Sequence, residues 1–76
     1  MASPAAELVA FMAKGMVAHK EEIHVRESDS GKLLELETHP DDRGRVIGRQ
    51  GRVAKAMRAL LGVSPHGASC RLDIVD

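Results

Sequence analysis

Two glycines three positions apart, Gly48 and Gly51, divide the most helix-prone part of this chain into two pieces. Each glycine inside a helix costs about 1 kcal/mol relative to alanine, so the pair predicts a turn between two helices. Such a turn leaves the backbone bare, which lets a nucleic-acid backbone approach closely. The N–H groups at the start of the second helix favour phosphate through their unpaired donors and the helix dipole. Arg49 and Gln50, at the middle of the turn, can both donate hydrogen bonds to phosphate oxygens.

The charges along the chain are segregated, although the formal net charge is zero. Residues 1–42 hold four basic and nine acidic residues, a net charge of −5, and residues 59–76 carry −1. Residues 43–58 hold six basic residues and no acidic residue, a net charge of +6. This asymmetry indicates an anionic partner. Arg43 and Arg58 fit an ordinary solvated helix face. The basic residues that would extend the positive field beside the turn are Arg45, Arg52 and Lys55.

Hydrophobic periodicity predicts six elements in the order α-β-β-α-α-β. They are a helix at 4–18, strands at 22–28 and 33–38, a short helix from about Pro40 to Gly48, a second helix from about Gly51 that Gly62, Pro65 and Gly67 stop, and a last strand at 69–76. The turn chemistry between the first two strands predicts an antiparallel hairpin. The two-helix connection to the last strand is long enough for parallel pairing with a right-handed crossover. We expect a single α+β domain over residues 1–76, with a three-stranded mixed sheet and helices on one face.

Few residues point to catalysis, to a bound metal or to a membrane. No histidine has a partner three or four residues away on a helix, and Cys70 alone completes no tetrahedral set. Asp41 and Asp42 are better explained by the favourable start of a helix than by paired-carboxylate catalysis. No apolar run approaches the roughly 20 residues of a membrane span, and a lone cysteine fits a reducing compartment. We therefore expect a cytoplasmic protein without catalytic residues, metal or cofactor. The histidines are His19, His24, His39 and His66.

The element order and the segment "RVIGRQGRVAKAMR" together resemble the type II KH domain, and in particular the small bacterial KH proteins of the KhpA (YlqC) family. The resemblance covers nearly the whole chain. It implies that the Gly48–Gly51 loop clamps the backbone of a single-stranded nucleic acid. It also implies that Val46 and Ile47 line an apolar groove, with Val53 opposite them. Two further residues lie either in the groove floor or in the core beneath it: Leu34 and Leu36.

The same resemblance implies partners. Such a protein would bind single-stranded RNA, as an RNA chaperone or post-transcriptional regulator, pair with itself, and partner a larger KH protein of the Jag (KhpB) type. Family members usually continue the second helix through an alanine- and lysine-rich stretch, whereas Pro65 forbids a continuous helix here. We expect self-association through Leu60, Leu61 and Val63. The alternative is a protein–protein adaptor that dimerises through a KH fold and has little nucleic-acid affinity; Arg49 and the intact glycine pair favour RNA binding.

Overall fold

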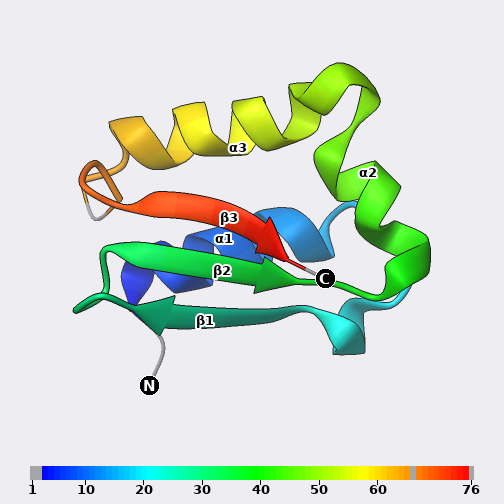
Figure 1. The fold of residues 1–76 in the computed structure, drawn as a ribbon, viewed down its shortest axis with the longest axis horizontal. Coiled ribbons are helices and arrows are strands. Elements are labelled where there is room, and N and C mark those ends of the chain that lie inside the picture. The colour runs from blue at the N-terminus through cyan, green and yellow to red at the C-terminus, as the bar shows by residue number, and fades with distance from the viewer. Residues whose placement is uncertain (1–2, 66, 76) are drawn as a thin grey trace.

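The computed structural model of the chain describes residues 3–65 and 67–75, and this part of the chain forms three α-helices and three strands. Figure 1 shows how these elements are arranged. The elements are α1 (Pro4–Lys14), the 3-10 turn η1 (Lys20–Glu22), β1 (His24–Ser28), β2 (Leu33–Glu37), the 3-10 turn η2 (Pro40–Asp42), α2 (Arg43–Ile47), the 3-10 turn η3 (Arg49–Gly51), α3 (Arg52–Val63) and β3 (Arg71–Val75). The predicted α-β-β-α-α-β order is confirmed.

Helix α1 begins where the sequence predicts and ends earlier. The Ser3 hydroxyl oxygen accepts a hydrogen bond from the Ala6 N–H at 3.1 Å, as expected of an N-cap. The sequence predicts a helix up to residue 18, whereas α1 ends at Lys14. The prediction is wrong at this end because Gly15 closes the last turn. Val17 is still buried, but it reaches the core from the connection that follows the helix.

The sheet has the order β1-β2-β3, with β2 in the centre. β1 pairs with β2 in antiparallel fashion, and β2 pairs with β3 in parallel fashion, which confirms the predicted mixed sheet. Leu34 lies opposite Leu72, and Leu36 lies opposite Ile74. These pairs form the rows of one sheet face because side chains alternate between faces along a strand.

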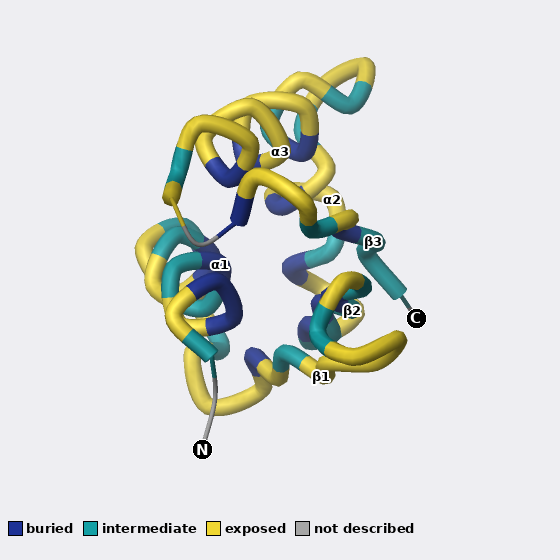
Figure 2. Tube along the Cα trace, turned by 90° about the vertical axis from the view of Figure 1, so that its left-hand side faces the viewer, coloured by how far each residue is buried: buried dark blue, intermediate teal, exposed yellow. Residues whose placement is uncertain are grey.

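The core lies between the sheet and a layer of helices. In Figure 2, α1 and α3 lie on one side and the strands on the other, with buried segments turned toward the space between them. Leu34 and Leu36 are fully buried, so they belong to the core and do not form a groove floor. Between them along β2, Glu35 is only half-buried, which is the alternation that the sequence predicts for a strand with one wet face.

The end of α3 brings the chain back toward the sheet. The helix continues through Gly62, which the sequence predicts as a stop, and ends one residue later at Val63. Ser64 is extended, with ψ of 137°, as steric contact with the ring of Pro65 requires. Gly67 then passes so close to α3 that a Cβ atom on it would lie 2.6 Å from the Leu61 carbonyl oxygen. Among the described residues, no helix has the length and apolar character needed to cross a membrane.

Candidate nucleic-acid interface

The Gly48–Gly51 turn between α2 and α3 is built from left-handed backbone. The φ angles of Gly48, Gln50 and Gly51 are 77°, 57° and 73°. A Cβ atom on Gly48 would lie 2.8 Å from the backbone nitrogen of Val53, whereas one on Gly51 would meet nothing within 4 Å. The first glycine therefore allows close packing of the turn against α3, and the second leaves the outer backbone uncovered.

The first turn of α3 opens directly onto this bare loop. The N-cap of α3 is Gly51, which has no side chain to accept hydrogen bonds from the N–H groups that follow it. α3 is a full helix of 12 residues, so its dipole places partial positive charge at this end. The Gly51 and Arg52 N–H groups donate to the carbonyl oxygens of Gly48 and Arg49, so the donors on offer are the next N–H groups of α3, which have no side-chain cap, and the side chains of the loop.

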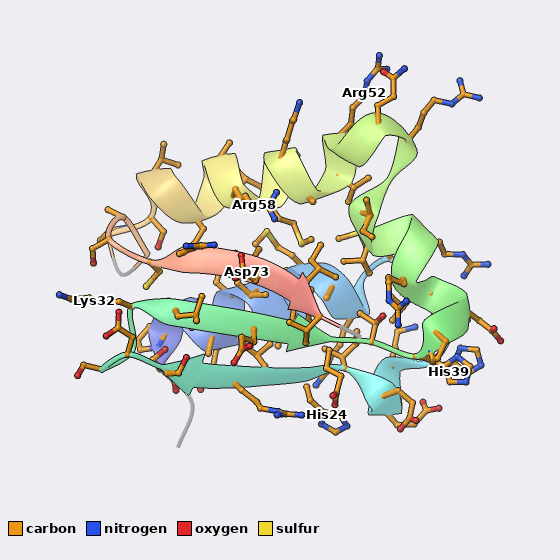
Figure 3. All side chains as sticks on the ribbon, viewed as in Figure 1. His24, Lys32, His39, Arg52, Arg58 and Asp73 are labelled. Carbon is orange, nitrogen blue, oxygen red and sulfur yellow. The ribbon has the colours of Figure 1, made fainter. Side chains whose placement is uncertain are left out.

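The predicted cations surround the loop, and two of them already have partners. Arg49 and Lys55 are exposed. Arg52 donates from Nη2 to the Gln50 side-chain oxygen at 3.2 Å, and Figure 3 shows Arg52 directed away from the body of the domain. The Gln50 amide nitrogen keeps its own two donors. Arg45 is largely exposed, and its Nη1 lies 3.5 Å from Oδ1 of Asp42, the residue just before α2.

The apolar residues predicted to line a groove divide into two groups. Val46 is fully buried, so its side chain packs in the core and does not line a surface groove. The prediction is wrong for Val46 because α2 turns this position into the hydrophobic core. Ile47 is 36% exposed and Val53 is half-buried against Gly48, so both remain at the surface beside the loop.

A shallow hollow lies further along α3, where β3 begins. Its volume is about 470 Å³, and its lining contains none of the residues predicted to contact RNA. Arg58, interpreted from sequence as a solvated residue, donates from Nε to the Leu72 carbonyl oxygen at 3.0 Å, and Figure 3 shows it between α3 and β3. No sequence pattern indicates this contact. The hollow is lined by Arg58, Leu61, Cys70, Arg71, Leu72 and Asp73.

A buried carboxylate, Asp42, holds the start of α2 in place. Asp42 is 1% exposed and accepts hydrogen bonds from the backbone N–H groups of Ala18 at 3.2 Å and His19 at 3.0 Å, and from the His19 ring at 2.9 Å. Burial alone would raise the pKa of Asp42, but these hydrogen bonds outweigh it and lower the pKa to about 2. The hydrogen bond to Asp42 in turn raises the pKa of His19. Sequence reasoning assigned Asp42 only to the helix dipole, because its partners lie 23 and 24 residues away.

The residues predicted for self-association do not share one surface. Leu60 is 55% exposed and Val63 is 81% exposed, at the end of α3. Leu61 is 2% exposed and packs in the core under Gly67, so it cannot offer a contact to a second chain. The predicted contact surface is therefore reduced to Leu60 and Val63.

The element order, the mixed sheet and the Gly-x-x-Gly turn between two helices define a KH domain of type II. The family model described as KhpA/KhpB, KH domain matches residues 6–74, and the chain belongs to this family. The resemblance drawn from the sequence is confirmed.

Named relatives agree with this assignment. The chain is 41% identical over 73 residues to a protein named RNA-binding protein KhpA from Leifsonia xyli subsp. xyli, covering 93% of this chain and 96% of that one. It is 44% identical over 73 residues to a protein of the same name from Halalkalibacterium halodurans, covering 91% and 96%. A third, from Clostridium perfringens, is 46% identical over 57 residues, covering 72% and 76%. No solved structure matches the chain significantly.

Proposed function

We propose that this chain binds single-stranded RNA through its Gly48–Gly51 loop and catalyses no reaction on it. The observation that carries the proposal is the bare left-handed turn that leads directly into the uncapped start of α3, inside the one strongly basic segment. A single strand would lay about two to four phosphates along the loop and the first turn of α3, with its bases toward Ile47 and Val53.

Different groups of the loop and of α3 have different roles in RNA binding. The N–H groups at the start of α3 and the side chains of Arg49 and Gln50 hold phosphate oxygens. Arg45, Arg52 and Lys55 raise the local positive potential. No aromatic ring lies in the basic segment, so bases rest on aliphatic side chains and stacking contributes little. Loose base specificity is the result.

The same segment argues against chemistry on the RNA. Residues 43–58 contain no carboxylate and no imidazole, the side chains that most often act as general acid or base. We place the protein among RNA chaperones or post-transcriptional regulators of the cytoplasm, acting with a copy of itself or with a larger KH protein of the Jag (KhpB) type. Relatives named for RNA binding support the first part of this proposal.

An adaptor that dimerises and binds little RNA is the second candidate. The observation in its favour is the exposure of Leu60 and Val63 at the end of α3. The two candidates differ in what the loop does, so a loop variant separates them.

The test is a titration of a short unstructured RNA against wild type and the double variant Arg49→Asp/Gln50→Asp at low salt. Both side chains are exposed, and aspartate tolerates the positive φ of position 50, so the fold should be kept. Ser30→Asp/Lys32→Asp is a matched control. It makes the same change in charge on two exposed residues of the β1–β2 turn, and Ser30 has the same φ of 57° as Gln50.

We expect the loop variant to lose at least about tenfold in affinity, since two negative charges would face the phosphates. The control should lose much less, because Lys32 lies at the other end of the domain from Arg52 (Figure 3). If the loop variant binds as tightly as wild type, the loop is not the site and the adaptor is favoured. Equal losses in both variants would mean that only the net charge matters.

A further inference from the structure

We propose that His19, His39 and Asp41 form a binding site for a divalent transition-metal ion such as Zn²⁺, separate from the RNA-binding loop. The sequence predicts no metal set, because no histidine has a partner at helical spacing. The structure brings these residues together from two different connections: His19 immediately precedes η1, and His39 immediately precedes η2. One ligand atom of each residue lies within 4.8 Å of those of the other two.

The two imidazole rings are stacked, with centroids 3.9 Å apart and planes 13° from parallel. An Asp41 carboxylate oxygen lies 3.7 Å from Nδ1 of His39. Two imidazoles and one carboxylate are donors that suit zinc, copper and nickel. Three protein ligands with water in the remaining position make an open site of ordinary composition for zinc.

A carboxylate outside the set fixes the orientation of His19. Asp42 is buried and, as a carboxylate, can only accept the hydrogen bond that joins it to Nδ1 of His19 at 2.9 Å. Nδ1 therefore carries the proton, and Nε2 of His19 keeps a lone pair for a metal. A metal-bound histidine whose other nitrogen donates to a carboxylate is the usual arrangement in proteins, and it strengthens the ligand.

His39 offers a lone pair as well. Its Nδ1 accepts the Asp41 backbone N–H at 3.1 Å, so this nitrogen carries no proton in the neutral ring. A metal ion would take this lone pair in place of the N–H, which water can then solvate because Asp41 is exposed. The site thus needs no change in the backbone to supply its second nitrogen.

Closure around an ion requires a modest rotation of the side chains. Ligand atoms around a tetrahedral zinc lie roughly 3.3 Å apart, since each sits about 2.0–2.1 Å from the metal. Here the ligand atoms lie within 4.8 Å of one another, with Nδ1 of His39 3.7 Å from the Asp41 carboxylate, and two nearly parallel rings cannot both aim at one ion. The side chains of His19, His39 and Asp41 are 37%, 31% and 76% exposed, which leaves them room to tilt.

A bound ion would join the connection between α1 and β1 to the connection between β2 and α2. Figure 3 shows His39 near one end of α2 and Arg52, beside the Gly48–Gly51 loop, near the other end. The ion would therefore not occupy the RNA-binding surface. Metal binding would stabilise the domain, because an ion that binds the folded chain shifts the folding equilibrium toward it.

Substitution by asparagine isolates the metal ligands from the hydrogen bonds. In His19→Asn the amide nitrogen can still donate to Asp42, and in His39→Asn the amide oxygen can still cap the Asp41 N–H. Both variants remove the imidazole. His24→Asn is the matched control, because His24 is exposed on β1 and lies outside the set.

The experiment is calorimetric titration of ZnCl₂ into tag-free protein after removal of metal with a chelator and dialysis. We expect one ion per wild-type chain, at least a tenfold loss of affinity in His19→Asn and in His39→Asn, and a change of less than about twofold in His24→Asn. An absence of stoichiometric binding by wild type would overturn the proposal. Undiminished binding by the double variant His19→Asn/His39→Asn would do so as well.

A spectrum of the wild-type protein decides the matter even where a variant folds poorly. Zinc should shift the imidazole ¹H–¹³C signals of His19 and His39 and leave those of His24 in place. Equal shifts at all three histidines, or shifts at His24 alone, would contradict the site.

Discussion

Gly48 lies so close to the first turn of α3 that a Cβ atom on it would sit 2.8 Å from the backbone nitrogen of Val53. A Cβ atom on Gly51, three residues later, would meet nothing within 4 Å. Both residues have positive φ, so both favour glycine for conformational reasons, but only Gly48 is also required by space. The two glycines of the motif therefore contribute differently to stability.

The glycines can be separated by alanine substitution. Gly51→Ala should cost about 1–2 kcal/mol of unfolding free energy, the strain of a left-handed alanine. Gly48→Ala should cost about 2–4 kcal/mol, because overlap with Val53 adds to the strain. Urea unfolding of both variants measures the difference. Equal losses, or a larger loss for Gly51→Ala, would mean that the turn is not packed against α3 in this way.

The affinity for RNA should depend strongly on salt. Each phosphate contact on a single strand contributes a slope of about −0.7 in log K against log salt, so about two to four contacts give roughly −1.4 to −2.8. Arg49→Ala should flatten the slope by about 0.7. Binding measured at several salt concentrations tests this. A slope near zero would point to recognition without phosphate contacts.

Duplex RNA of the same length should bind more weakly than a single strand. The bases of a duplex are paired and stacked, so they cannot turn toward Ile47 and Val53 as bases of a single strand can. Competition between the two RNAs for a labelled single strand is a direct measurement. A duplex that competes equally well would indicate that the loop recognises phosphate charge alone.

Removal of the Asp42 carboxylate should destabilise the domain in a pH-dependent way. In the presence of a chelator, Asp42→Asn should lower Tm by about 5 °C or more, whereas the exposed Asp41→Asn should change it little. The pKa of Asp42 lies below its ordinary value of 3.8, so its contribution is present above that pH and is lost as pH falls through about 2. The raised pKa of His19 adds stability below 6.5 that is lost as pH rises through the folded value.

The difference in Tm between wild type and Asp42→Asn should therefore be largest between about pH 4 and pH 6. Thermal unfolding of both proteins across this range gives the comparison. A difference that stays constant from acid to alkaline pH would show that the hydrogen bonds to His19 and Ala18 carry no charge-dependent stability.

Self-association should depend on the exposed residues at the end of α3. Leu60→Asp/Val63→Asp should shift a dimer to monomer in sedimentation equilibrium, because two charges would face each other across a symmetric contact. Phe11→Asp is the control, since Phe11 is 77% exposed on α1. A wild type that is monomeric at high micromolar concentration would remove this contact. So would a dimer that weakens only in Phe11→Asp. Leu61 is unsuitable for the test because its substitution would disrupt the core.

Local patterns were enough to predict the fold and the loop. Alternation puts Leu34 and Leu36 on one face of β2, which is the buried face in the structure, and the Gly48–Gly51 spacing locates the turn between the helices. Both signals act over a few residues, where backbone geometry relates sequence spacing directly to direction in space. The family resemblance rested on the same stretch.

The remaining features depend on contacts between distant parts of the chain. Asp42 accepts hydrogen bonds from the backbone N–H groups of Ala18 and His19, in the connection before β1. No local sequence pattern indicates these hydrogen bonds. Arg58 likewise donates a hydrogen bond to the Leu72 carbonyl oxygen, 14 residues away along the chain. The family resemblance implies a groove role for Val46 and a pairing role for the end of the second helix, but in this chain Val46 and Leu61 are both buried in the core.

We propose above all that the Gly48–Gly51 loop and the first turn of α3, as far as Lys55, hold the RNA backbone. The most direct measurement is a titration of ¹⁵N-labelled protein with a short unstructured RNA, followed by ¹H–¹⁵N spectra at low salt. We predict that the amide signals of this segment shift most, and that those of the β1–β2 turn around Lys32 stay in place. Shifts centred on the sheet, or no shift near Gly48 at saturating RNA, would contradict the account.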